Sequence, residues 1–280
     1  MRDVAVLIPT LRRPAMLERA LRSVFAQVGS LDRIAAVVVA DNDPEGSAAA
    51  LIDRLRVEAP VPLTYAHAPV PGVATARNVG LAATDARLIA FLDDDEAASP
   101  GWLSALLQAQ SQTGADVLFG PIRGRVPEGT GWTTAYLERF FGRDGPTQTR
   151  LTDQIHGCGN SLMVRATALP GPAPFDSAMD QTGGEDDRLF TALQARGGRF
   201  GWAADAWVDE FAPPDRATWM LIGAAQTAVW GLASLALTLL RRPARAETLD
   251  RMSRGLGKVF WTSCFEPKLY GAAMVRRTGA

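Results

Sequence analysis

Short apolar runs alternate with segments of helical periodicity along the first 120 residues of the chain. The apolar runs VAVLIP (4–9), IAAVVVAD (34–41), LTYAHA (63–68) and LIAFLD (88–93) predict strands. The segments between and after them predict helices at about 14–28, 46–57, 72–83 and 100–113. Nearly continuous apolar strands that alternate with helices are typical of a mainly parallel open sheet covered on both faces. We therefore predict an α/β fold, in which ligands bind beyond the carboxyl ends of the strands.

The pattern is looser beyond residue 116. DVLFGPIRGRV (116–126), HGCGNSLMVR (156–165) and the stretch around 199–209 predict strands, and a helix is expected from about 185 to 196. No internal repeat or low-complexity linker interrupts this region. We predict one domain over residues 1–215, followed by a basic, helical C-terminal extension over residues 216–280.

Composition and charge add two points to this picture. Cys158 and Cys264 are far apart, and the N-terminal MRDVAVLIPT has a strand pattern, so a reducing, cytoplasmic setting is expected. The formal net charge is −1, yet the last 40 residues hold nine of the 29 Lys and Arg but only three of the 30 Asp and Glu. We therefore expect the acidic part and the basic tail to have different roles.

An acidic cluster, LDDDE, follows the fourth predicted strand. Along an extended chain, Asp93 and Asp95 would project to one side and Asp94 to the other. Two adjacent carboxylates repel each other unless a cation neutralises them, and Mg²⁺ and Mn²⁺ prefer such oxygen ligands. The cluster predicts a divalent metal site, and its alternative is a solvated acidic turn before a helix capped by Ser99.

Two further clusters have the composition of a nucleotide site. Asp41 or Asp43, in ADND after the second strand, could accept a hydrogen bond from a ribose hydroxyl or a base N–H. Arg77, in the helix that leads to LDDDE, could bind a diphosphate through its planar guanidinium. The alternative for ADND is a simple turn, and the alternative for Arg77 is a surface arginine without a ligand.

The segment GGEDDRLF predicts a helix that begins with acidic residues. Asp186 precedes Leu189 and Phe190 by three and four residues, so it should share their inward face, whereas Asp187 is turned away. An inward carboxylate near a helix start could serve as a general base. Ordinary helix N-terminal charge is the alternative.

These clusters, in this order, resemble the family 2 glycosyltransferases, which share the GT-A fold. The resemblance covers residues 4 to about 215 and is carried by the segments VAVLIPT, VVVADND, GVATARNVGL, FLDDDE, GCGNSLMVR and GGEDDRLF. It implies a divalent metal, Mg²⁺ or Mn²⁺, held with the donor diphosphate by Asp93 and Asp95, and it implies that Asp186 is the catalytic base. The other implied nucleotide-sugar-binding residues are Thr10, Asp41 or Asp43, Arg77 and Asp94.

The resemblance also implies the reaction. Members of this family invert the sugar by a single in-line displacement, in which the base removes a proton from the attacking acceptor hydroxyl. The expected donor is a UDP-, GDP- or dTDP-sugar, and the expected acceptor is a glycan or a lipid-linked molecule of cell-envelope polysaccharide biosynthesis. No nucleic-acid partner is expected.

The chain departs from the family pattern in three places. The acid after the second strand is often a doublet in the family, whereas ADND separates its two aspartates, so the nucleoside contact is left open between Asp41 and Asp43. The Q-x-x-R-W signature of processive members is absent after Asp186, so a polysaccharide-extruding synthase is not expected. Where many members have a metal-binding histidine, this chain has WVDEFAPPDR, and Glu210 is a candidate substitute ligand. We expect His67 and His156, which have no metal-ligand spacing, to be non-catalytic.

Other functional classes fit the sequence less well. A nucleotidyltransferase on a similar sheet would need a glycine-rich, basic first loop, which PTLRRPAML does not provide. A haloacid dehalogenase-like phosphotransferase would carry its acidic motif after the first strand rather than the fourth. A non-catalytic sugar-nucleotide-binding protein stays open as an alternative.

Residues 219–240 form a run of 22 residues without a charge, and RRPAR follows directly. About 20 apolar residues suffice to span a bilayer, but Gln226, Thr227 and Ser234 make this run only moderately hydrophobic. A membrane-surface helix, a core helix and a true span are the three interpretations. The basic residues after Arg241 favour the first, because they are attracted to anionic headgroups, and they predict a peripheral location on the cytoplasmic face of the inner membrane.

Overall fold

The computed structural model describes residues 2–127 and 133–212. The chain divides into two compact units, one of residues 1–125 and 138–211 and the other of residues 126–137 and 212–280. Apart from the first residues of one helix, α5 (Thr134–Phe141), everything described below belongs to the first unit. The predicted extension, residues 216–280, and its uncharged run lie outside the described residues, so both predictions stay open. No helix among the residues described has the length and apolar character needed to cross a bilayer.

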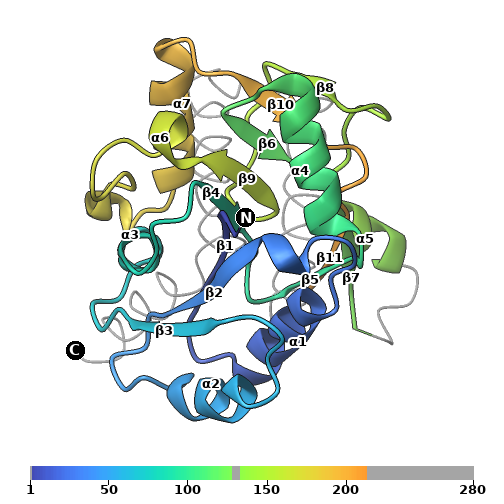
Figure 1. Cartoon of the computed structure of the whole chain (residues 1–280). Coiled ribbons are helices and arrows are strands. Elements are labelled where there is room, and N and C mark those ends of the chain that lie inside the picture. Colours follow the sequence, from blue (N-terminus) through green and yellow to red (C-terminus); the bar gives the residue numbers. More distant parts are fainter. Residues whose placement is uncertain (1, 128–132, 213–280) are drawn as a thin grey trace, which may run out of the picture. The chain divides into compact units, whose positions relative to one another are not determined.

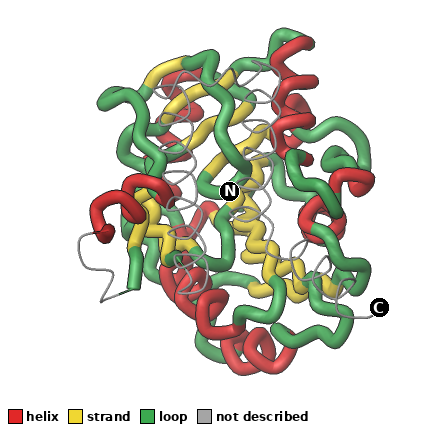
Figure 2. Tube along the Cα trace, turned by 180° about the vertical axis from the view of Figure 1, so that it is seen from behind, coloured by secondary structure: helices red, strands yellow, loops and turns green. Residues whose placement is uncertain are grey.

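An eight-stranded mixed sheet forms the centre of the first unit (Figures 1 and 2). Its strands, in spatial order, are β3 (Leu63–His67), β2 (Ile34–Asp41), β1 (Val4–Thr10), β4 (Leu88–Phe91), β9 (Ser161–Val164), β6 (Val117–Phe119), β10 (Phe200–Trp202) and β8 (Arg150–Leu151). Strands β9 and β8 run antiparallel to their neighbours, and the other pairs in this sheet are parallel. A second, three-stranded sheet has the order β5 (Glu96–Ala98), β11 (Val208–Phe211) and β7 (Ile122–Arg125).

Helices pack on both faces of the large sheet, as alternating apolar side chains require. Val6 and Ile8 of β1 lie in one core cluster with helices α1, α2 and α4, whereas Leu7 of the same strand lies in another cluster with α3 and α7. The helices of these two clusters are α1 (Pro14–Phe25), α2 (Ala49–Arg56), α4 (Trp102–Thr113), α3 (Val73–Ala82) and α7 (Glu185–Ala195). The short helices η1 (Leu31–Arg33), α6 (Arg165–Ala168) and η3 (Ser177–Met179) lie in connections, and α5 (Thr134–Phe141) crosses the boundary between the units. The predicted α/β open-sheet fold is confirmed.

Two expected strands are each divided between the two sheets. The stretch 116–126 becomes β6 and β7, because Pro121 between them has no N–H to continue the hydrogen-bond ladder. The stretch 199–209 becomes β10 and β11, with a turn in which the Ala206 N–H donates to the Ala203 carbonyl at 3.1 Å. The second sheet was therefore not anticipated.

The carboxyl ends of β1, β2 and β4 form one edge of the large sheet. Thr10 at the end of β1 is paired directly with Asp41 at the end of β2, and Phe91 at the end of β4 is paired with Leu7 of β1. The segments that follow these strands are those in which sequence reasoning placed the site.

Candidate active site

The acidic cluster after β4 is a turn, not an extended strand. β4 ends at Phe91, two residues earlier than predicted. The backbone N–H of Asp93 donates to Glu96 Oε2 at 2.9 Å, and the N–H of Glu96 donates to the Asp93 carbonyl at 3.1 Å. We call residues Asp93–Glu96 the acidic turn. The helix that follows begins at Trp102. The N–H of Leu103 in its first turn donates to Gln27 Oε1 at 3.0 Å, so the Ser99 cap of the alternative interpretation is absent.

The strand-alternation argument for the three aspartates is therefore wrong. A single nitrogen, Nη1 of Arg13, lies 3.1 Å from both Asp94 Oδ1 and Asp95 Oδ2, so these two carboxylates turn toward the same side. Asp93 diverges toward Arg77, whose Nη2 is 4.0 Å from Asp93 Oδ1. Local turn hydrogen bonds replace the two-residue period of a strand, and that period no longer sets the directions of the side chains.

Asp93 is the most accessible carboxylate of the acidic turn. Its side chain is 39% exposed, compared with 7% for Asp94 and 8% for Asp95. Loss of hydration raises the pKa of Asp93, and the like charges of Asp95 and Asp186 raise it further, although Arg77 opposes them. A cation bound here would relieve this repulsion.

Thr10 and Asp94 interact with each other. The Thr10 hydroxyl donates to Asp94 Oδ2 at 2.8 Å, and both residues are buried. Burial raises the pKa of Asp94, while Arg13 and Thr10 act in the opposite direction. The structure therefore joins the end of β1 to the acidic turn, and the predicted contact of these two residues with the nucleotide stays a prediction.

Asp41 organises the loop that follows β2. Its Oδ1 accepts the N–H of Asp43 at 3.1 Å, and its Oδ2 accepts the N–H of Ala48 at 2.8 Å and the Tyr65 hydroxyl at 3.0 Å. Asp43 instead pairs with Arg12, whose Nη2 lies 2.9 Å from Asp43 Oδ1 and whose side chain is 63% exposed. Of the two aspartates, only Asp43 is bound to a side chain that solvent reaches freely.

Arg77 is buried, so the surface alternative is wrong. Its Nη1 donates to Glu185 Oε1, and both side chains are 6% exposed. Burial by itself would lower the pKa of Arg77, but the neighbouring Asp93 and Glu185 outweigh it and the net shift is upward. Arg77 thus supplies a fixed positive charge between α7 and the acidic turn, and its approach to a nucleotide stays a prediction.

Replacing Arg77 by methionine should therefore destabilise the fold. The change leaves the buried Glu185 carboxylate without its cation, and breaking a buried ion pair in this way costs about 3–5 kcal/mol. The measurement is the free energy of unfolding from urea denaturation. Arg22→Met, which removes an exposed arginine that pairs with Glu18 and Glu58, is the matched control. Equal losses in the two variants would contradict a structural role for the buried pair.

Asp186 lies beside the loop Gly157–Asn160. Its Oδ2 accepts the N–H of Cys158 at 3.0 Å, and its Oδ1 accepts the N–H of Asp187 at 2.9 Å. Asp186 is partly buried and Asp187 is exposed, as the helical period predicted. Sequence reasoning missed that Glu185, at 5% exposed, is the most buried acid of this helix.

The same loop also contacts the acidic turn. A Cβ atom on Gly159 would lie 2.4 Å from Asp93 Oδ2, so only glycine allows this approach. Arg143 fixes the loop by donating to the carbonyls of Gly157 at 3.1 Å and Gly159 at 2.7 Å. The loop thus lies against Asp186 on one side and Asp93 on the other.

Glu96, Asn160 and Arg143 are site residues that sequence reasoning did not assign. Glu96 Oε2 accepts the N–H of Asn160 at 3.2 Å in addition to that of Asp93. Burial raises the pKa of Glu96 well above its usual range, and Asp93 and Glu210 add to this effect. The position of Glu96 directly after three aspartates could have identified it as a site residue. Arg143 is isolated in the sequence, and no sequence pattern marks it as one.

Glu210 lies opposite Glu96 in the pairing of β11 with β5. Among the residues that the structure describes, no group of three His, Cys, Asp or Glu side chains is arranged to hold a metal ion. The role of Glu210 as a substitute metal ligand therefore stays a prediction. His156 packs against Phe119 and Trp202, and burial lowers its pKa to about 4. The non-catalytic role expected of His156 stays a prediction.

Comparison with known proteins gives concordant matches. The family described as "Glycosyl transferase family 2" matches residues 5–169. Succinoglycan biosynthesis protein ExoM of Rhizobium meliloti (strain 1021) is 35% identical over 210 residues, which are 75% of this chain and 67% of ExoM. Succinoglycan biosynthesis protein ExoW of the same organism is 34% identical over 127 residues, which are 44% of this chain and 39% of ExoW.

Solved structures show the same fold. TarS of S. aureus (residues 1–349, in complex with UDP) matches with a TM-score of 0.58 and 16% identity over 79% of this chain and 64% of that chain. The mannosyltransferase PcManGT from Pyrobaculum calidifontis, in complex with GDP-Man and Mn²⁺, matches with a TM-score of 0.58 and 17% identity over 79% of this chain and 61% of that chain. The chain thus spans somewhat less than two thirds of these two solved chains.

Proposed function

Since this chain belongs to glycosyl transferase family 2, and is a glycosyltransferase with the GT-A fold, we propose that it moves a sugar from a nucleoside diphosphate sugar to an acceptor hydroxyl with inversion. The observation that carries this proposal is the placement of Asp186 and Asp93 on either side of the loop Gly157–Asn160. The neighbours that contain UDP, UDP-GlcNAc or GDP-Man support the donor class.

In this proposal Asp186 is the general base. Two backbone N–H groups, from Cys158 and Asp187, hold its carboxylate in a fixed direction. A carboxylate held in this way can accept the proton of an acceptor hydroxyl as that oxygen attacks the anomeric carbon. A base on one side of the sugar and a leaving diphosphate on the other require in-line displacement, which inverts the anomeric configuration.

Asp93 and Asp95 are the residues that would hold a divalent cation. The support is that both lie in one turn, where the charge of Asp95 raises the pKa of Asp93, and that Mg²⁺ takes one or two carboxylates together with substrate phosphates. Arg13, which contacts Asp95 at 3.1 Å, would then release that carboxylate to the cation. When bound, the cation would neutralise the negative charge on the departing nucleoside diphosphate. Structures with Mn²⁺ among the neighbours support this proposal.

We place the nucleoside near Asp43 rather than Asp41. Both carboxylate oxygens of Asp41 already accept hydrogen bonds from its own loop and Tyr65. Asp43 is itself buried, but its partner Arg12 is 63% exposed and can turn to a phosphate. The acceptor is proposed to be a glycan or lipid-linked saccharide, in line with the two succinoglycan biosynthesis proteins to which the chain is similar.

A donor panel tests this proposal. Full-length protein is incubated with UDP-, GDP- and dTDP-sugars, with Mg²⁺, Mn²⁺ or excess chelator, and release of nucleoside diphosphate is measured together with the anomeric configuration of the product by NMR. We expect consumption of one donor class, dependence on the cation and inversion. Retention of configuration would contradict the assigned mechanism, and full activity in chelator would contradict the metal.

A further inference from the structure

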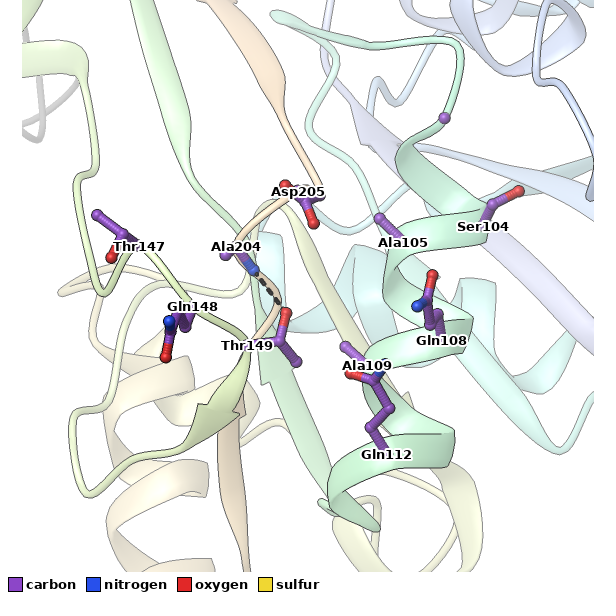
Figure 3. A pocket seen from close by; sticks show the side chains of 11 residues that line it. Ser104, Ala105, Gln108, Ala109, Gln112, Thr147, Gln148, Thr149, Ala204 and Asp205 are labelled. Carbon is purple, nitrogen blue, oxygen red and sulfur yellow. Dashed lines mark hydrogen bonds between the residues drawn. The ribbon is translucent and has the colours of Figure 1, made fainter.

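A groove of about 550 Å³ lies apart from the acidic turn and Asp186 (Figure 3). One wall is the outer side of α4, and the facing walls are residues 147–149 and the turn at Ala204–Asp205. None of the residues assigned above to metal, donor or base lines it. Its volume falls within the range of ordinary ligand sites, roughly 300–1,000 Å³.

Uncharged hydrogen-bonding groups face this groove from both walls. The amides of Gln108 and Gln112 come from α4, and that of Gln148 comes from the opposite wall. All three residues are exposed, and within the described part of the chain their amides make no hydrogen bond to protein. Each amide offers both a donor and an acceptor, which is the pair of functions that a hydroxyl group needs.

The rest of the lining disfavours a charged ligand such as a nucleotide. Among the described residues that line the groove there is no lysine or arginine, and the one ionisable residue among them, Asp205, repels anions. Small residues, among them Ala105 and Ala109 of α4, lie between the amides and leave space for a ring to approach the helix. A neutral molecule with many hydroxyl groups is the chemistry that fits.

Two of the walls, α4 and the turn at Ala204–Asp205, share a support with the active site. Asn160 is fully buried, and its Oδ1 accepts the indole N–H of Trp102, in the first turn of α4, at 2.8 Å. Its Nδ2 donates at 3.0 Å to the carbonyl of Ala206, next to the turn at Ala204–Asp205. Its backbone N–H donates to Glu96 of the acidic turn. The same residue, Asn160, therefore holds two walls of the groove and the acidic turn in place.

We propose that this groove binds neutral saccharide units of the acceptor chain, at a distance from the hydroxyl that is extended. The proposal rests on the proposed function for the nature of the acceptor. In this proposal the amides of Gln108, Gln112 and Gln148 bind sugar hydroxyls. The groove would then be a second saccharide site beside the catalytic one.

Binding is tested without donor or catalysis, by titration calorimetry of the full-length protein. The probes are cellohexaose and laminarihexaose, which are neutral, and hexagalacturonate, which is anionic. The double variant Gln108→Ala, Gln112→Ala should bind the neutral probe about tenfold more weakly, since it loses hydrogen bonds from two amides. Gln148→Ala, on the opposite wall, should weaken binding in the same direction. Gln110→Ala is the matched control, because Gln110 is on the same helix but does not line the groove.

The outcomes separate this inference from the proposed function. Saturable binding of a neutral probe, lost in the groove variants and kept in Gln110→Ala, supports the groove even where no donor is consumed in the panel above. Binding of neither neutral probe, equal affinity in all variants, or tighter binding of hexagalacturonate would overturn it, and active transfer in the donor panel would then show that only the groove assignment failed. Thermal unfolding by circular dichroism confirms that the variants are folded.

Discussion

Asp186→Asn is expected to lower turnover by about 10²–10⁴-fold, the usual loss on removal of a general base. Asparagine keeps an oxygen that can accept the Cys158 N–H, so the local structure should persist. It does not accept a proton at neutral pH, so the acceptor hydroxyl would attack without assistance. The measurement is kcat for transfer, together with donor affinity, which should stay close to that of the unchanged protein.

Asp187→Asn is the control for this prediction. Asp187 has the same chemistry and is one residue further along α7, but its side chain is exposed, whereas Asp186 is partly buried next to Cys158. Turnover of this variant should change far less. Equal losses in the two variants would show that the direction of Asp186 on α7 does not determine its role.

Asp95→Asn is expected to reduce transfer by about three orders of magnitude or more and to weaken binding of the nucleoside diphosphate. The reason is that a cation in such a site contributes several kcal/mol to stabilisation of the transition state, and each 1.36 kcal/mol is a factor of about ten in rate. Arg13 keeps its contact with Asp94, so the acidic turn should stay folded. Transfer and nucleotide binding are measured with and without Mn²⁺.

Asp209→Asn is the matched control for Asp95. Asp209 also pairs with arginines, at 3.2 Å to Arg123 and 3.1 Å to Arg125, but it takes no part in the proposed site. This variant should keep its transfer activity and its response to Mn²⁺. If Asp95→Asn retained full, cation-dependent transfer, the acidic turn would not be the metal site.

Much of the fold was accessible from the sequence, because local patterns determine it. The period of apolar residues placed the helices α1, α3 and α7 to within about three residues at each end, since burial on one face demands that spacing. The ordered motifs identified the family, and the matches confirm it. The family makes the chain a glycosyltransferase rather than a nucleotidyltransferase or a non-catalytic binder. The same helical period separated Asp186 from the exposed Asp187.

The details of the site were not accessible in this way, because contacts between distant residues carry no local period. Arg77 pairs with Glu185, 108 positions away, and this contact removes Arg77 from the surface. Likewise, Asn160 joins Glu96, Trp102 and Ala206, which belong to three separate segments.

The sequence alone therefore determined the α/β architecture, the strand ends at which the acids gather and the family, each of which follows from short-range pattern and motif order. Tertiary structure alone decided which carboxylates face one another. The turn hydrogen bonds of Asp93 and Glu96 override the strand alternation that the apolar run predicted. Burial places the Arg77 guanidinium beside Glu185 and Asp93 rather than at the surface. The groove beside α4 also exists only in the folded chain, because its walls come from three separate segments. Asn160 joins two of them through hydrogen bonds to Trp102 and Ala206.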